Sequence, residues 1–125
     1  MRFLSPEWAE AVTSGLNASD EFKAAAASTS TTVQQVVTDA PEGELRYWLG
    51  IEAGVATMGT GDAADPQVII NQSYETAVAL ATGELNAVNA YMSGKLQISN
   101  VMKAMSLQGP LQALAPVIRG IDCEY

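Results

Sequence analysis

The 125-residue chain contains no histidine and only one cysteine, Cys123. Without histidine, neither a Ser–His nor a Cys–His catalytic pair can form, and metal sites built on imidazole ligands are excluded. A single cysteine cannot build a disulfide framework or a thiolate metal cluster. We therefore expect no resident metal and no cofactor, which leaves carboxylates, hydroxyl groups and apolar surface for any function.

Positive charge is also scarce. Six Lys and Arg residues stand against fourteen Asp and Glu residues, which gives a net charge of −8. A protein that binds a phosphate backbone needs clustered basic residues, whereas these six are scattered along the chain. We expect no nucleic-acid partner, and at most a transient membrane contact around Lys95 and Lys103.

Long hydrophobic runs are missing as well. No stretch approaches the roughly 18 consecutive apolar residues of a transmembrane helix, and the first residues lack the apolar core of a secretory signal. A cytoplasmic location is the expectation. Hydrophobic residues nevertheless make up 48% of the chain, which is typical of a packed protein, and its length predicts one domain over residues 1–125. The oligomeric state stays open.

The N-terminal part carries clear helix signals. Ser5 is a capping residue, and Pro6 suits the first helical position. Trp8, Val12 and Leu16 follow at helical spacing, so we expect one apolar face and a helix that ends near 15–17. A second short helix is predicted to begin at 19–21 and to end near 27.

From Ser28 onward the pattern becomes that of strands. Ser, Thr and Val dominate 28–37, and alternating apolar residues follow over 44–52. The Pro41–Gly43 turn and the tight Ala53-Gly54 turn predict an antiparallel meander that continues through 55–59. A further strand is expected over 67–71.

The C-terminal part returns to helices. Ser73 caps a helix that Gly83 ends; another helix is expected over 86–93, and a short strand over 95–99. Asn100 caps a helix expected to end at Gly109, and Pro110 opens a last segment that Pro116 should kink or end. The pattern predicts an α+β fold, with helices at both ends and a mostly antiparallel sheet between them.

The carboxylates fall mainly at turns and caps. Asp62 and Asp65 flank a Gly/Ala loop, which lacks the spaced oxygen ligands of a calcium site. Gly59-Thr60-Gly61 has no following lysine, so it is no phosphate-binding loop. We interpret these residues as turn formers.

Three methionines, Met92, Met102 and Met105, fall in the last third of the chain. Methionine fills irregular space in a core and also adapts to variable apolar ligands. The helices there and just before carry many alanines, which allow either close packing or room for a ligand. The residues alone leave both interpretations open.

The stretch from Tyr74 to Gln108 resembles the sterol carrier protein type 2 family of lipid-binding domains. The resemblance is carried by Thr82-Gly83-Glu84-Leu85 in register with Met92-Ser93-Gly94-Lys95-Leu96, and then by Met102, Ala104-Met105 and Leu107-Gln108. It implies a five-stranded, mainly antiparallel sheet covered on one face by helices. It also implies an apolar tunnel between sheet and helices for fatty acids, acyl-CoA esters, sterols or similar lipids, and no catalytic residue.

Our leading hypothesis is therefore a non-enzymatic carrier of an apolar small molecule. Two alternatives stay open: an interaction module that recruits a partner enzyme, and a cofactor-free enzyme with a buried carboxylate base and a tyrosine donor. The candidate ligand-binding residues come from the predicted sheet and from the C-terminal helices. They are Leu49, Ile51, Val78, Tyr91, Met92, Met102 and Met105.

Overall fold

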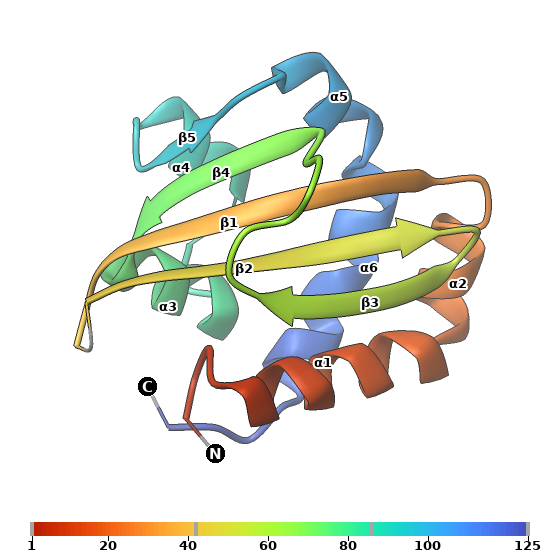
Figure 1. Ribbon diagram of the computed structural model, residues 1–125, viewed down its shortest axis with the longest axis horizontal. Helices are drawn as coiled ribbons and strands as arrows, with labels where there is room; N and C mark the ends of the chain where they lie inside the picture. Colours follow the sequence, from red (N-terminus) through yellow and green to blue (C-terminus); the bar gives the residue numbers. More distant parts are fainter. Residues whose placement is uncertain (1, 42, 86, 125) are drawn as a thin grey trace.

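A computed structural model of the chain describes residues 2–41, 43–85 and 87–124. One five-stranded sheet runs through it, in the order β3-β2-β1-β4-β5 (Figure 1). The strands are β1 (Ser30–Ala40), β2 (Gly43–Glu52), β3 (Val55–Thr60), β4 (Val68–Ser73) and β5 (Leu96–Ile98).

The first three strands form the predicted antiparallel meander. Val33 of β1 pairs with Leu49 of β2, and Leu49 pairs with Met58 of β3. β4 then lies on the other side of β1 and runs parallel to it, and β5 is antiparallel to β4. The predicted mainly antiparallel sheet is confirmed, with one parallel pair that requires the chain to cross the sheet between β3 and β4.

The helices α1 (Pro6–Ala18) and α2 (Asp20–Ala25) begin where the sequence predicts. The hydroxyl of Ser5 accepts a hydrogen bond from the backbone N–H of Trp8 at 3.2 Å, as an N-cap should. α3 (Tyr74–Thr82) is capped in the same way by Ser73, and it ends at Gly83, whose φ of 83° is a left-handed conformation that glycine adopts without strain.

The C-terminal helices are α4 (Ala87–Met92), α5 (Val101–Ser106) and α6 (Gln108–Arg119). Two predictions were wrong here. α5 ends at Ser106 rather than at Gly109, and α6 begins at Gln108 rather than at Pro110. α6 also continues past Pro116, so of the predicted kink or end at this proline the structure contradicts the end. A proline in the first turn of a helix removes no needed donor. Pro116 lies inside α6 and removes the one N–H that would bond to the carbonyl of Gln112, and the helix continues in spite of this loss. The predicted turn at Glu42 and helix start at Asn86 lie outside the described residues.

The helices cover one face of the sheet. α3 and α6 lie behind the central strands in Figure 1, and α1 lies along the edge strand β3. Apolar side chains between the layers form two clusters of buried residues. The first cluster includes Trp8, Val12, Leu16, Phe22, Val37, Leu49 and Ile51. The second cluster includes Val33, Val68, Ile70, Ala90, Leu96 and Leu107.

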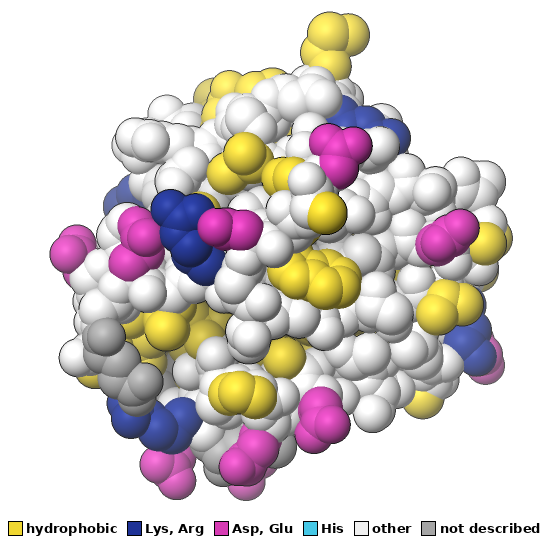
Figure 2. Space-filling view, in the orientation of Figure 1, with side chains coloured by type: hydrophobic (Ala, Val, Ile, Leu, Met, Phe, Trp, Pro, Cys, Tyr) yellow, Lys and Arg dark blue, Asp and Glu magenta, His cyan; other side chains and the backbone are white. Residues whose placement is uncertain are grey.

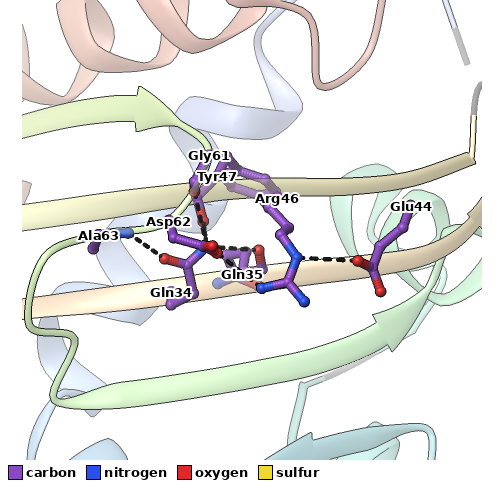
Figure 3. A network of polar contacts seen from close by, with 8 residues as sticks. All are labelled: Gln34, Gln35, Glu44, Arg46, Tyr47, Gly61, Asp62 and Ala63. Carbon is purple, nitrogen blue, oxygen red and sulfur yellow. Dashed lines mark hydrogen bonds and ion pairs between the residues drawn. The ribbon is translucent and has the colours of Figure 1, made fainter.

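No described helix covers the opposite face of the sheet, which we call the open face. The connection between β3 and β4 crosses this face (Figure 1). The side chain of Gln34, only 3% exposed, holds this crossing in place. Its amide nitrogen donates to the carbonyl oxygens of Tyr47 and Gly61 at 3.1 and 3.0 Å, and its oxygen accepts from the N–H of Ala63 at 2.7 Å (Figure 3).

Asp62 in the same crossing pairs with Arg46 at 2.8 Å, and Arg46 also contacts Glu44 at 3.0 Å (Figure 3). The pairing with both carboxylates raises the pKa of Arg46, first through the hydrogen bond with Asp62. Asp62 therefore acts as a residue of the loop, as predicted from its place in a turn.

Trp48 lies on the open face, against Gly59 and Gly50. A side-chain carbon added to Gly59 would lie 2.5–2.7 Å from the indole ring, so this position has no room for one. The remaining hydrophobic groups on the open face are separated by polar and charged side chains (Figure 2). Among the described helices, none combines the length and the apolar character needed to cross a membrane.

Candidate functional site

The boundary between the two core clusters runs along the parallel strands β1 and β4. On β1, Val37 belongs to the first cluster and Val33 to the second, and Gln35 lies between them on the same face. On β4, Gln72 pairs with Val37 on one side and with Leu96 of the second cluster on the other. Two glutamines therefore occupy the boundary between two apolar regions.

These glutamines contact each other. The side-chain nitrogen of Gln72 donates to the side-chain oxygen of Gln35 at 2.8 Å. Gln72 is only 7% exposed, and its own side-chain oxygen is buried with no hydrogen-bond partner among the described residues. An amide oxygen buried without a donor costs about 1–3 kcal/mol, so native structures rarely retain one without a reason.

The same interior contains the aromatic side chains of Tyr47 and Trp8. Tyr47 pairs with Gln35 across β1 and β2, and its ring lies 6.0 Å from that of Trp8 in an edge-to-face arrangement. Burial raises the pKa of Tyr47, because the phenolate would lose its hydration. Trp8 is 2% exposed, and its indole N–H is the second buried polar group without a partner in the described structure.

Charged groups stay outside. All six Lys and Arg residues are described: Lys103 is half-buried and the others are exposed. Every described Asp and Glu side chain is exposed too. The interior between sheet and helices therefore offers apolar side chains with a few uncharged polar groups, an arrangement that suits binding of an apolar molecule rather than acid–base chemistry.

Three predicted ligand-binding residues lie in this interior. Leu49 and Ile51 are 5% and 2% exposed and belong to the first core cluster. Val78 of α3 is half-buried and packs against that same cluster. The structure thus brings these three together.

The other four predicted residues lie at the surface. Tyr91 and Met92 at the end of α4 are 41% and 78% exposed, and Met102 and Met105 of α5 are 85% and 64% exposed. α4 and α5 are short helices of six residues each at the β5 edge of the sheet, and hydrophobic side chains project there in Figure 2. A ligand in the interior is separated from these side chains unless it extends to that edge, so their role stays a prediction.

Gln35, Gln72, Tyr47 and Trp8 were not among the predicted site residues. A signal for the two glutamines was present, since each takes an inward position next to an inward Val or Ile two residues away in its strand. Whether the two amides meet depends on the parallel pairing of β1 and β4, which no local pattern indicates.

Two open grooves mark the surface of the described structure. One, of about 970 Å³, lies between α1 and β3 and is lined by Pro6–Glu7, Ala9–Ala11, Thr13, Ser14 and Thr57–Thr60. The other, of about 550 Å³, lies beside α3 and is lined by Asp39, Ser73–Glu75, Val78, Ala79 and Glu84. Val78 is the one predicted site residue that lines either groove.

The chain matches the model of a known protein family. The model of the SCP-2 sterol transfer family matches residues 12–112, which is most of the chain. The protein belongs to this family of lipid-binding and transfer domains, and the predicted resemblance is confirmed. A comparison with curated proteins finds no significant match.

Solved structures agree on the fold. A crystal structure of sterol carrier protein 2 is 21% identical, with a TM-score of 0.83 over 97% of this chain and 100% of that one. A conserved hypothetical protein from Thermus thermophilus, described as possibly a sterol carrier protein, is 21% identical, with a TM-score of 0.82 over 99% and 92%. The palmitated form of a sterol carrier protein 2-like protein from Aedes aegypti is 19% identical, with a TM-score of 0.66 over 97% and 99%.

Proposed function

We propose that this protein binds an apolar small molecule between the sheet and the helices and carries it without altering it chemically. The ligand classes are fatty acids, acyl-CoA esters, sterols or similar lipids. The observation that carries the proposal is the match to the SCP-2 sterol transfer family, on a chain whose interior sheet face holds no described charge.

Burial of apolar surface supplies the affinity. Each methylene group moved from water into an apolar site contributes about 0.8 kcal/mol, so a long acyl chain binds without any charged contact. We place such a chain along the boundary between the two core clusters, where it would separate residues of different clusters rather than residues packed within one. On the side of the first cluster, such a ligand would contact Leu49, Ile51 and Val78.

The rim of the site is proposed at the β5 edge. Tyr91, Met92, Met102 and Met105 present flexible or aromatic apolar surface to solvent there, with Lys95 also exposed. Apolar side chains that remain exposed on a small domain often mark an interaction site. A ligand would pass these residues as it enters, and a brief membrane contact would use the same edge.

An unchanged ligand fits the placement of the acidic residues. A cofactor-free isomerase needs a carboxylate inside the cavity, and the described carboxylates all face solvent. Acyl-CoA incubated with the protein should be recovered intact by mass spectrometry. Time-dependent formation of a product would contradict the carrier proposal.

Titration of delipidated protein with a fluorescent fatty acid and, separately, a fluorescent sterol tests binding itself. We expect saturable fluorescence enhancement with at least one of the two probes. The absence of saturable binding with both would overturn the proposal.

The proposed rim has a matched control. Met92→Gln and Met102→Gln remove exposed apolar surface at the β5 edge, and Val55→Thr does so at the β3 side of the sheet, where Val55 is 56% exposed. We expect the two Met variants to slow ligand transfer from vesicles and Val55→Thr to leave it unchanged. Equal rates of ligand transfer in all three variants would show that the proposed rim residues take no part in transfer.

A further inference from the structure

We propose that the amide pair of Gln35 and Gln72 binds an uncharged hydroxyl group at the polar end of an otherwise apolar ligand. This inference rests on the proposed function, because it concerns the same interior. It adds the chemical class of the ligand: a long-chain alcohol or another hydroxyl-bearing lipid, in preference to an ionised fatty acid.

The position of the pair is the first support. Gln35 lies between Val33 and Val37 on β1, and these two valines belong to different core clusters. Gln72 lies between Val37 and Leu96, which again belong to different clusters. A ligand held between the clusters would therefore lie against the two amides, and its polar end is the part that can use their hydrogen-bonding groups.

Unused hydrogen-bonding capacity is the second support. One hydrogen bond of 2.8 Å joins the two side chains, and it leaves the side-chain oxygen of Gln72 buried without a donor in the described structure. The residue is 7% exposed, so bulk water does not solvate this oxygen freely. A ligand hydroxyl can donate to it, and since a hydroxyl also accepts, it matches either end of an amide.

The surroundings select against a charged end group. No Lys or Arg is buried in the described structure, so a carboxylate placed here would have no cation beside it. Tyr47, which pairs with Gln35 across the strands, shows the same preference, because burial raises its pKa and keeps it neutral. The interior favours a polar but uncharged ligand end.

Competition with a neutral hydrocarbon probe tests this preference. Pyrene is loaded onto delipidated full-length protein, and 1-decanol, decyl methyl ether and decanoate are each titrated in to displace it. The alcohol donates a hydrogen bond, the ether only accepts one, and decanoate is charged. We expect 1-decanol to displace pyrene at about fivefold lower concentration than the ether, the value of one added hydrogen bond, and decanoate to be the weakest.

The matched variants are the double variant Gln35→Met/Gln72→Met and the single variant Gln97→Met. Methionine has nearly the shape of glutamine but accepts a hydrogen bond only weakly, and Gln97 is an exposed glutamine on β5. Both amides are replaced together because Gln72→Met alone would leave the side-chain oxygen of Gln35 without its donor and able to accept the hydroxyl instead. In the double variant the advantage of the alcohol over the ether should fall to about onefold, with retained pyrene affinity as the sign of a folded protein, and in Gln97→Met the advantage should persist.

The outcomes separate the two proposals. No pyrene binding to the wild-type protein overturns the carrier function and this inference together. Pyrene binding to the wild-type protein without a preference for the alcohol, or a preference that survives in Gln35→Met/Gln72→Met, overturns only the hydroxyl site. Tightest binding of decanoate also overturns it, because an ionised end group would then be favoured.

Discussion

Asn17 in the last turn of α1 and Ala56 in the edge strand β3 are joined by two hydrogen bonds. The side-chain nitrogen of Asn17 donates to the carbonyl oxygen of Ala56 at 3.0 Å, and the N–H of Ala56 donates to the side-chain oxygen of Asn17 at 2.8 Å. The asparagine thus satisfies backbone groups that an edge strand otherwise presents to solvent or to another chain. This contact attaches the first helix to the sheet.

Asn17→Ala should therefore lower the free energy of unfolding by about 1–3 kcal/mol, because Ala56 is fully buried and would keep two unpaired backbone groups. Urea denaturation measures the change. Asn89→Ala, at an exposed asparagine of α4, is the control and should change stability little. Equal effects of the two substitutions would show that the Asn17 contact contributes nothing specific.

Gln34→Leu should loosen the chain crossing over the open face. The substitution removes the hydrogen bonds to the backbone of Tyr47, Gly61 and Ala63. We expect the free energy of unfolding to fall by about 2–4 kcal/mol, because these backbone groups lose their partner. Faster amide hydrogen exchange at Ala63 is the direct measurement. Asp62→Asn in the same crossing should have no measurable effect on stability, because the ion pair with Arg46 is exposed to solvent.

Gly59→Ala should displace the indole of Trp48, which leaves no room for a side-chain carbon at that position. Overpacking of this kind typically costs about 1–3 kcal/mol. A change in the near-UV circular dichroism of tryptophan should accompany the loss. Gly109→Ala is the matched control, since its added carbon would meet Ala25 at an ordinary 3.9 Å, and it should keep both stability and spectrum.

Tyr47 makes stability depend on alkaline pH. Because burial raises its pKa in the folded protein, only the unfolded chain ionises Tyr47 once the pH exceeds about 10, and stability should fall as the pH rises further. Urea denaturation at pH 9 and pH 11 measures this loss. In Tyr47→Phe the loss between the two pH values should be smaller, whereas in Tyr91→Phe, at an exposed ring, it should persist. An unchanged slope in Tyr47→Phe would contradict the burial argument.

The helix and strand positions were largely predictable because their signals are local. Ser5 and Ser73 cap their helices with one hydroxyl each, and Gly83 ends α3 through its own left-handed backbone. The boundary between α5 and α6 was missed because Gly109 and Pro110 were interpreted as a stop and a start. Pro110 lies in the first turn of α6, where its missing N–H is not needed, and α6 continues past Pro116 although that residue removes one helix hydrogen bond.

The candidate site was less predictable because apolar side chains look alike in a sequence. Leu49 and Ile51 are inward-facing strand residues, and alternation alone placed them in the interior. Met102 and Met105 have the same character in the sequence, yet they lie on a short helix at the edge of the sheet and face solvent. Exposure there depends on what packs against the helix, which is not a local property.

By itself, the sequence determined the α+β class, the family, and the absence of histidine chemistry and of a disulfide framework, because composition, caps, turns and motif spacing are properties of the chain. The tertiary structure decided that the Gln72 amide meets that of Gln35 and that every described carboxylate faces solvent. The parallel pairing of β1 with β4 brings Gln35 into contact with Gln72, which is 37 positions away in the chain. Such a contact depends on how the whole sheet is assembled, so only the folded chain shows where an apolar interior contains a hydrogen-bonding group.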